Sequence, residues 1–417
     1  MQKLEVFGAN KLKGQIKISG SKNASLPILA ATLLSNKKTY LKNLPKVKDI
    51  QTMLSLLKSL GSKVKIKKNE TIIDNTKQRK KFASYGLVKT MRAGILVLGP
   101  LLAKFGSAKV SLPGGCAIGS RPVDLHLKAL SKLGVKYKID QGYVIANAPK
   151  GLKGSNIRFS RISVGATENL IIASSFAKGT TILSNCAIEP EIKDLVNFLN
   201  KMGCQIKWKS KRTIKIIGVE EVKETIYSVM FDRIEAGTYL VAAAVTEGNL
   251  KIKNVIPKVI RTEINILKKI GSKINFKKEE IHIIGNKNIK SMNIKTAPYP
   301  GFSSDMQAQI MVLLCKANKS SIVQENIFEN RFMHVAELNR MGAKILTKGN
   351  KAIVKGNINF AAAELMATDL RASVSLILAA LTAKGKSVIN RIYHLDRGYE
   401  EIEKKLRKVG AKIRRVN

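Results

Sequence analysis

The sequence is poor in cysteine and in aromatic residues, and it lacks a long apolar run. Its 417 residues include four cysteines, one tryptophan and 5% aromatic residues in all. The cysteines form no Cys-x-x-Cys pair, so neither a disulfide framework nor a cysteine-based metal site is expected, and a reducing cytoplasm fits best. No run approaches the ~20 apolar residues that a membrane span needs, and no signal-peptide core follows the first residues. We therefore expect a cytoplasmic protein without a membrane partner.

Acidic residues are also scarce, with 29 Asp and Glu against 74 Lys and Arg, which gives a formal net charge of +45. Such a charge can indicate a nucleic-acid partner. However, 58 of the cations are lysines that spread along the whole chain, and aromatic residues do not alternate with them as a single-strand-binding surface requires. We expect a solvated surface and no nucleic-acid partner. The 16 arginines are then informative, because bidentate anion recognition is what lysine cannot supply.

One phrase recurs six times: a helix that ends in an apolar residue and glycine, followed by a strand rich in lysine or isoleucine. The glycines lie 68 to 73 residues apart and are Gly61, Gly134, Gly203, Gly271, Gly342 and Gly410. Glycine after a last helical turn is a C-cap signal, and one fixed period indicates a repeated supersecondary unit. The period exceeds the ~20–50 residues of solenoid repeats. We therefore predict six α/β units, divided three and three, rather than a solenoid.

Each unit is expected to open with a helix that is apolar nearly all round and therefore buried. A short strand, a second and amphipathic helix, and further strands follow in each unit. The predicted opening helices span 24–34, 93–102, 166–177, 234–245, 306–317 and 372–383.

A cysteine lies in a glycine-rich stretch at 112–125, which reads Leu-Pro-Gly-Gly-Cys-Ala-Ile-Gly-Ser-Arg-Pro-Val-Asp-Leu. The glycines allow a mobile loop. Pro122 suits the first turn of a helix, and Asp124 suits the positive end of its dipole. The stretch predicts Cys116 on a loop beside Arg121 at a helix entrance, which is a setting that activates a thiol.

Cations stand where helices are expected to begin, although a helix N-terminus disfavours positive charge by ~0.3–1 kcal/mol. Ahead of opening helices they are Lys22, Arg92, Arg233 and Arg371. Ahead of second helices, at one shared register, they are Arg121, Arg331 and Arg397. The repetition indicates anions bound between these helix ends. Arg233 is left out of the candidate site, because Asp232 and Glu235 beside it are expected to pair with it.

Asp305 occupies the same helix-entry position without a cation. Its side chain could cap the helix, or it could act as a general base that faces the anion site. The histidines show no metal-ligand spacing, so we expect structural histidines, no metal site and no cofactor. They are His126, His282, His334 and His394.

Taken together, these stretches resemble the enolpyruvyl transferase family, in particular the members that act on UDP-N-acetylglucosamine in bacterial peptidoglycan synthesis. The resemblance implies two inside-out α/β domains, each made of three repeats around buried helices. One domain would span 22–229, including the loop at 112–125, and the other would combine 1–21 with 230–417, with the active site in the cleft between them. The matching stretches run in order along the chain: 20–24, 112–125, 163–167, 232–235, 305–309, 329–332, 369–372 and 396–400.

The resemblance also implies a reaction, in which the enolpyruvyl group of phosphoenolpyruvate moves to the 3′-hydroxyl of UDP-N-acetylglucosamine and phosphate is released. In that reaction Cys116 would donate a proton to C3 and Asp305 would deprotonate the hydroxyl. Lys22, Arg121 and Arg397 would hold the phosphoenolpyruvate anions, with help from Arg371 at the carboxylate. The remaining substrate-binding residues implied are Asn23, Arg92, Pro122, Val123, Asp124, Leu125, Arg161, Ser163, Val164, Gly165, Ile327 and Arg331.

Arg161 departs from the family, because many members carry a lysine there, and arginine keeps the charge but changes its geometry. Two other functions stay open at this point. The sister enzymes that act on shikimate 3-phosphate are the nearest alternative, although the Gly-Gly-Cys loop and the Arg-Pro-Val-Asp-Leu run are not expected in them. A basic nucleic-acid-binding protein without catalysis is the second alternative. We expect a monomer.

Overall fold

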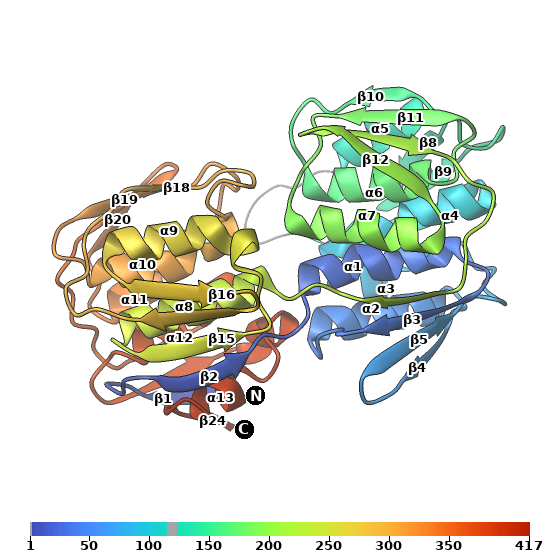
Figure 1. Cartoon of the computed structure of the whole chain (residues 1–417). Coiled ribbons are helices and arrows are strands. Elements are labelled where there is room, and N and C mark those ends of the chain that lie inside the picture. The colour runs from blue at the N-terminus through green and yellow to red at the C-terminus, as the bar shows by residue number, and fades with distance from the viewer. Residues whose placement is uncertain (1, 115–122) are drawn as a thin grey trace. The chain divides into compact units, whose positions relative to one another are not determined.

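The computed structural model describes residues 2–114 and 123–417 (Figure 1). The chain divides into two compact units. We call residues 2–19 and 231–417 the terminal unit, and residues 20–114 and 123–230 the middle unit. The chain passes from one unit to the other between Ser19 and Gly20 and again between Met230 and Phe231. Each unit has its own hydrophobic core.

In the middle unit, three opening helices lie at the centre and three second helices accompany them. The opening helices are α1 (Lys22–Ala31), α4 (Leu98–Phe105) and α6 (Val164–Ser174). The second helices are α2 (Lys48–Ser59), α5 (Asp124–Lys132) and α7 (Pro190–Met202). Shorter pieces are η1 (Thr32–Leu34), α3 (Tyr85–Val88) and η2 (Arg92–Val97). The helix predicted over 93–102 therefore begins as the 3₁₀ turn η2 and continues as α4.

The described part of the middle unit contains three four-stranded sheets. The first, in spatial order, is β14 (Thr225–Ser228), β3 (Lys38–Lys42), β5 (Glu70–Asp74) and β4 (Lys63–Ile66). The second is β6 (Phe82–Ala83), β7 (Ser107–Ser111), β9 (Tyr143–Asn147) and β8 (Lys136–Asp140). The third is β10 (Asn156–Arg158), β11 (Thr180–Ser184), β13 (Thr213–Ile217) and β12 (Gln205–Ser210).

The terminal unit repeats this plan. Its opening helices are α8 (Arg233–Val245), α10 (Gln307–Cys315) and α12 (Leu370–Ala380). Its second helices are α9 (Arg261–Ile270), α11 (Val335–Arg340) and α13 (Ile402–Arg407). The 3₁₀ turns are η3 (Pro257–Ile260), η4 (Ser304–Met306) and η5 (Ile392–Arg397).

Three four-stranded sheets are also found in the described part of the terminal unit. The first is β2 (Lys13–Lys17), β15 (Asn249–Lys253), β17 (Glu280–Ile284) and β16 (Lys273–Lys277). The second is β18 (Ile294–Lys295), β19 (Ser321–Gln324), β21 (Lys351–Val354) and β20 (Ile345–Lys348). The third is β22 (Glu364–Met366), β23 (Lys386–Asn390), β1 (Lys3–Phe7) and β24 (Lys412–Val416).

All six sheets share one pairing pattern, in which the first two strands are parallel and the other pairs are antiparallel. The first strand of each sheet comes from a neighbouring repeat. In the middle unit, β14 closes the series by pairing with β3 at the start. In the terminal unit, β1 and β2 take the places of the last two strands of the sixth repeat. The first residues of the chain therefore complete its last repeat.

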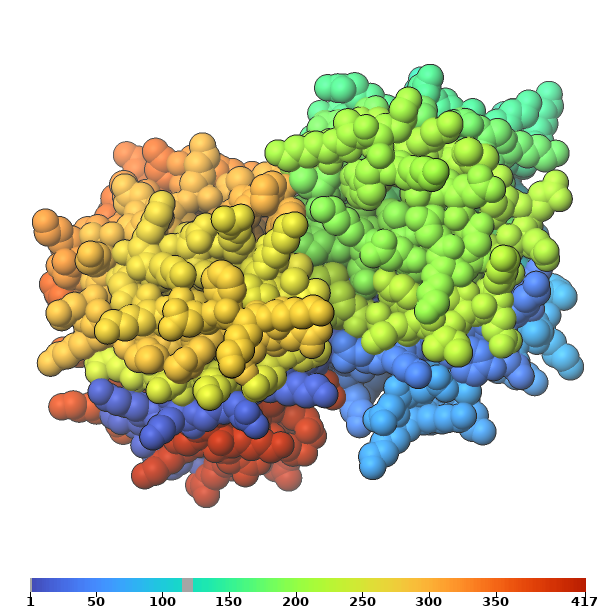
Figure 2. All heavy atoms as spheres, in the orientation of Figure 1, coloured from blue at the N-terminus to red at the C-terminus, as the bar shows by residue number. Residues whose placement is uncertain are grey.

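The opening helices are buried because they carry so little charge. Every residue of α8 and of α10 is buried, and α8, α10 and α12 pack against one another. On the face seen in Figure 2, the segment with β15, α9 and β16 (yellow) forms an outer layer over this unit. None of the described helices is both long and apolar enough to cross a bilayer.

The six glycines of the recurring phrase all have positive φ values, between 90° and 122°. Glycine adopts this conformation without the penalty that a Cβ brings, and the C-cap signal read from the sequence is therefore confirmed. The predicted α/β class and the repeated unit are confirmed as well.

Candidate active site

Asp305 lies in the short turn η4, which precedes α10 in the terminal unit. The N-cap of this turn is Ser303, whose hydroxyl accepts a hydrogen bond from the Asp305 backbone N–H at 3.2 Å. The capping position is thus taken by a neighbour, and the Asp305 carboxylate extends toward two arginines instead. Its side chain is 28% exposed, so the carboxylate is also reachable from outside the protein.

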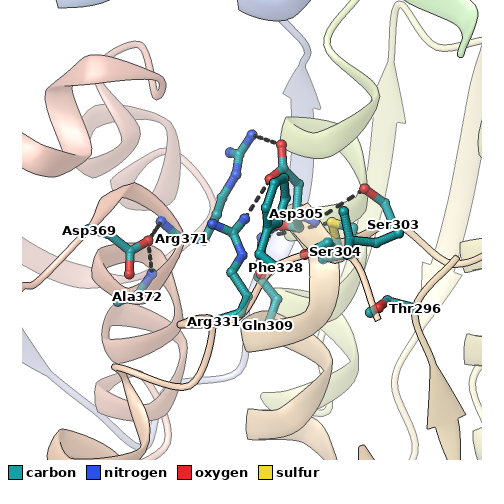
Figure 3. A network of polar contacts seen from close by, with 12 residues as sticks. Thr296, Ser303, Ser304, Asp305, Gln309, Phe328, Arg331, Asp369, Arg371 and Ala372 are labelled. Carbon is teal, nitrogen blue, oxygen red and sulfur yellow. Dashed lines mark hydrogen bonds and ion pairs between the residues drawn. The ribbon is translucent and has the colours of Figure 1, made fainter. Parts of the chain in front are cut away.

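Two guanidinium groups hold this carboxylate (Figure 3). Arg331 Nη2 donates to Oδ1 at 2.5 Å, and Arg371 Nη2 donates to Oδ2 at 2.9 Å. Both arginines are buried, with side chains 5% and 6% exposed. Burial alone would lower the pKa of Arg371, but the charge and hydrogen bond of Asp305 outweigh it and the pKa is raised. Such charge-assisted hydrogen bonds are among the strongest in proteins.

A buried network of hydrogen bonds holds Arg371 on the side away from Asp305. Its Nη1 donates to the Tyr399 hydroxyl at 3.2 Å, and that hydroxyl lies 2.9 Å from Thr238 Oγ1 of α8. Gln309 of α10 donates to Thr238 Oγ1 at 3.2 Å and to the Asp305 carbonyl at 2.9 Å. The network joins the N-terminal halves of all three opening helices of the terminal unit, so the arginine and the carboxylate have fixed orientations.

Arg397 is half-buried and is the last residue of η5. The pKa of His394 is lowered, first by burial and then by the charge of Arg397, so the two side chains are near each other. Arg331 and Arg397 stand ahead of second helices, as expected, but they do not share one register. Arg331 lies four residues before α11, and α13 begins only after Glu401, whose positive φ of 45° cannot be part of a right-handed helix.

Lys22 is the first residue of α1 in the middle unit, where Ser21 is the N-cap. Its Nζ lies 3.2 Å from Oδ2 of Asp49, and both side chains are largely buried. Asp49 was missed by the sequence analysis, since an acid in the first turn of an amphipathic helix is ordinarily a surface residue. Asn23 follows Lys22 in α1 and is half-buried.

Arg92 begins η2, close to a buried histidine of α5. The pKa of His126 is lowered to about 3, mainly by burial, with a further contribution from the Arg92 charge. Its Nδ1 lies 3.1 Å from the side-chain amide of Asn169, and its ring contacts the start of α6 at Gly165. The neutral ring therefore packs between two of the helix starts predicted to bind anions, and its structural role is the expected one.

The other predicted residues of this unit lie at the starts of α5 and α6. Asp124 and Arg161 form an ion pair at 3.8 Å. Ser163 caps α6 by accepting from the Ala166 N–H at 3.3 Å, and Val164 after it is 38% exposed. Val123 and Leu125 are buried in the core of this unit, 6% and 8% exposed.

Cys116, Arg121 and Pro122 lie outside the described residues. The other cysteines are buried, and burial raises the pKa of Cys204 to about 11 and that of Cys186 and Cys315 to about 12. These three thiols are thus poor nucleophiles. Among residues 2–114 and 123–417, no group of three or more His, Cys, Asp or Glu side chains is arranged to hold a metal ion.

The described residues of the candidate site fall into two groups, one in each unit. One group belongs to the terminal unit and consists of Asp305, Ile327, Arg331, Arg371 and Arg397. Within it, Asp305 contacts both Arg331 and Arg371 directly. The others belong to the middle unit, at or near the starts of α1, η2, α5 and α6. Cations in the first turns of opening helices, as predicted, are confirmed for Lys22, Arg92, Arg233 and Arg371.

Known proteins resemble this chain over its whole length. The family model of EPSP synthase (3-phosphoshikimate 1-carboxyvinyltransferase) matches residues 6–406. The UDP-N-acetylglucosamine 1-carboxyvinyltransferase of Pelagibacter ubique is 77% identical over the full length of both chains. The protein of that name from Trichlorobacter lovleyi is 51% identical, again over both full lengths.

Solved structures show the same fold at low sequence identity. The enolpyruvyl transferase NikO from Streptomyces tendae is 23% identical, with a TM-score of 0.90 over 100% of this chain and 99% of that one. An EPSP synthase from Acinetobacter baumannii is 18% identical, with a TM-score of 0.78 over the whole of both chains. The chain therefore belongs to the EPSP synthase family of enolpyruvyl (1-carboxyvinyl) transferases.

Proposed function

We propose that this chain transfers the enolpyruvyl group of phosphoenolpyruvate to the 3′-hydroxyl of UDP-N-acetylglucosamine and releases phosphate. The observation that carries the proposal is the 77% identity, over the full length of both chains, to a relative named for this reaction. The same relatives favour the nucleotide-sugar acceptor over shikimate 3-phosphate. A place in peptidoglycan synthesis, and a cytoplasmic location, belong to the same proposal.

In the terminal unit, Asp305 is the proposed general base. A carboxylate that removes a hydroxyl proton must be ionised, reachable and fixed in direction. Asp305 is partly exposed and is held at both oxygens by Arg331 and Arg371. Opposite charges on either side favour the charged form of a carboxyl. We further propose that Arg371 and Arg397 bind the phosphoenolpyruvate anions.

In the middle unit, Lys22, with Arg121 outside the described residues, is proposed to share that task. The pairing of Lys22 with Asp49 would fix the ammonium group in place. Asn23, Arg92, the 121–125 segment, Arg161, Ser163, Val164 and Gly165 are the proposed contacts to UDP-N-acetylglucosamine, together with Ile327 of the terminal unit. The domain limits of 22–229 and 1–21 with 230–417 belong to the same proposal.

The proposed reaction has two steps. In the first, Cys116 gives a proton to C3 of phosphoenolpyruvate while the sugar oxygen bonds to C2 and its proton passes to Asp305. In the second, a proton passes from C3 back to the Cys116 thiolate, the C2–O bond to phosphate breaks, and the enol double bond forms again, while the departing phosphate takes the proton held by Asp305. Both steps involve a substrate with two anionic groups, so fixed cations stabilise the charge throughout.

Phosphate release tests the proposal. The purified protein is incubated with phosphoenolpyruvate alone, with UDP-N-acetylglucosamine added, or with shikimate 3-phosphate added. Phosphate release that depends on UDP-N-acetylglucosamine is the expected result. Turnover with shikimate 3-phosphate alone would assign the chain to the sister activity, and no release with either acceptor would reject enolpyruvyl transfer to both.

A further inference from the structure

Glu325 is a buried carboxylate that accepts hydrogen bonds from three separate segments of the terminal unit. It directly follows β19 and is 2% exposed. Its Oε1 accepts from the Thr296 hydroxyl at 3.0 Å and from the backbone N–H groups of Ile327 and Phe328 at 2.8 and 3.2 Å. Its Oε2 accepts from the Ser304 hydroxyl at 2.9 Å. Four donors offset much of the cost of burying this charge.

Three other repeats carry an asparagine at the position of Glu325, directly after the strand that follows the opening helix. In the first, third and fourth repeats it is Asn43, Asn185 or Asn254, each with a positive φ. Each asparagine amide donates to the carbonyl of the residue that directly follows the neighbouring parallel strand, at 2.8 to 2.9 Å. The residue with this carbonyl also donates its backbone N–H to the carbonyl of the residue just before the asparagine, which ends its strand. These donating residues are Val229, Phe159 and Ile18.

In the fifth repeat the residue that makes the side-chain hydrogen bond lies one position later in the sequence. Thr296 donates its N–H to Gln324, the last residue of β19, and its carbonyl accepts from the amide of Asn326 at 3.0 Å. Glu325 therefore occupies the position of the asparagines without performing their task. Its carboxylate turns instead toward η4 and the segment that follows β19.

Both targets of Glu325 lead directly to the proposed base. Ser304 is the first residue of η4 and immediately precedes Asp305. Phe328 lies under Arg331, whose guanidinium carbon is 5.5 Å from the ring centroid, and Arg331 holds Asp305 (Figure 3). One buried carboxylate thus connects the turn that carries Asp305 with the segment that carries its arginine partner.

We infer that Glu325 is a positioning residue for Asp305: it sets the geometry of η4 against the 326–331 segment and so aims the base at the acceptor hydroxyl. This inference rests on the proposed function, because it assigns Asp305 its role in proton removal. Glu325 does not touch the reacting atoms. Its effect on the rate has to pass through Asp305, and that dependence can be measured.

A double-mutant cycle tests the inference. We measure kcat for phosphate release with saturating phosphoenolpyruvate and UDP-N-acetylglucosamine in the wild type, Glu325→Ala, Asp305→Ala and the double variant. Glu325→Ala is expected to lower kcat by about tenfold or more, since misplacing a general base forfeits part of its contribution. In the Asp305→Ala background, the same substitution is expected to lower kcat by less than about twofold, because residues that act through one another are non-additive.

Two further variants separate positioning from a loss of folded protein. Glu325→Gln is expected to stay within about threefold of the wild-type kcat, because the amide oxygen can replace Oε1 and the Ser304 hydroxyl can accept from the amide nitrogen. Ser304→Ala removes only the link to η4, so it keeps the test open if Glu325→Ala fails to fold. Its loss of kcat should also disappear in the Asp305→Ala background. Asn254→Gly, at the equivalent position of the fourth repeat, is the matched control and should change kcat by less than about twofold.

The outcomes are distinguishable. An equal loss from Glu325→Ala with and without Asp305, or no loss at all, would overturn the positioning role while the proposed function stands. A wild-type protein that releases no phosphate with UDP-N-acetylglucosamine would reject the proposed function itself, and the positioning role with it.

Discussion

Arg371 and Asp305 lie 66 positions apart in the sequence, yet Nη2 of the arginine donates to Oδ2 of the aspartate at 2.9 Å. The contact exists because α10 and α12 pack against each other in the centre of the terminal unit. Their first turns therefore meet, and the repeat brings together side chains from two successive helix starts.

Replacing the proposed base should abolish most of the activity. Asp305→Asn is expected to lower kcat by about 10² to 10⁴, which is the usual contribution of a general acid or base. The amide keeps the shape of the side chain and one oxygen for an arginine, so the circular dichroism spectrum should not change. Steady-state phosphate release measures the effect.

Asp140→Asn provides the matched control, because Asp140 is an exposed aspartate of β8 that pairs with the surface residue Lys138 at 3.1 Å. It should leave kcat unchanged. Near-normal turnover of Asp305→Asn would contradict the role of this residue as a base.

Arg371 should not be replaceable by lysine. Its planar guanidinium donates to Asp305 and to the Tyr399 hydroxyl at once, and an ammonium group lacks the fixed fork that serves both. We expect Arg371→Lys to lower kcat/KM for phosphoenolpyruvate by about 10- to 100-fold, or ~1.4–2.7 kcal/mol. Arg340→Lys, on the exposed side of α11, is the control and should have no effect. Equal kinetics for both variants would show that charge alone suffices at position 371.

A thiol-reactive epoxide phosphonate such as fosfomycin should inactivate the protein by alkylating Cys116 alone. The other three cysteines are internal controls, since they are buried and their thiol pKa values are raised. Peptide mass spectrometry after inactivation locates the adduct. Cys116→Asp should keep turnover and escape the reagent, because a carboxylic acid can still donate a proton. Loss of activity with Cys116 unmodified would refute this role.

Asp194 should make the free energy of unfolding depend on pH. It lies in α7, where it accepts from the Tyr227 hydroxyl at 2.6 Å and from the Met230 N–H at 3.1 Å. Burial raises its pKa to about 6, despite these hydrogen bonds. Because the ordinary pKa of an aspartate is near 3.9, the folded protein holds this proton over a range where the unfolded chain has lost it.

The free energy of unfolding of the wild type, relative to Asp194→Asn, should therefore fall as pH rises from about 4 to about 6 and stay level above that. The full change is on the order of 2–3 kcal/mol. Denaturant unfolding of both proteins at several pH values provides the measurement. A difference that is independent of pH, or one that grows as pH rises, would show that the folded state does not disfavour the ionised carboxylate.

Local features of the fold could be predicted from the sequence because they depend on local chemistry. The six glycines take positive φ where the sequence places helix ends. The opening helices, which are mostly apolar, are buried as their composition requires. The pairing of β1 with β24 was not predicted by the repeats themselves, because it joins segments about 400 residues apart.

The residues of the candidate site could be named one by one from the sequence, but their contacts could not. Asp305, Arg331 and Arg371 could each be named, but their contact depends on how three helix starts pack. Asp49 and Glu325 gave no signal, because an acid reads as a surface residue until its burial is known. Arg397 does not share the register of Arg331, because the αL conformation of Glu401 delays the start of α13.

The central claim is that the enolpyruvyl group itself reaches the nucleotide sugar. Carbon-labelled phosphoenolpyruvate and UDP-N-acetylglucosamine are incubated with the protein, and the nucleotide sugar is analysed by mass spectrometry and by NMR. We predict that the label appears in the sugar nucleotide as an enol ether on the 3′-oxygen, in equal amount to the phosphate released. Phosphate release with no label in the nucleotide sugar, or with label at another oxygen, would contradict the account.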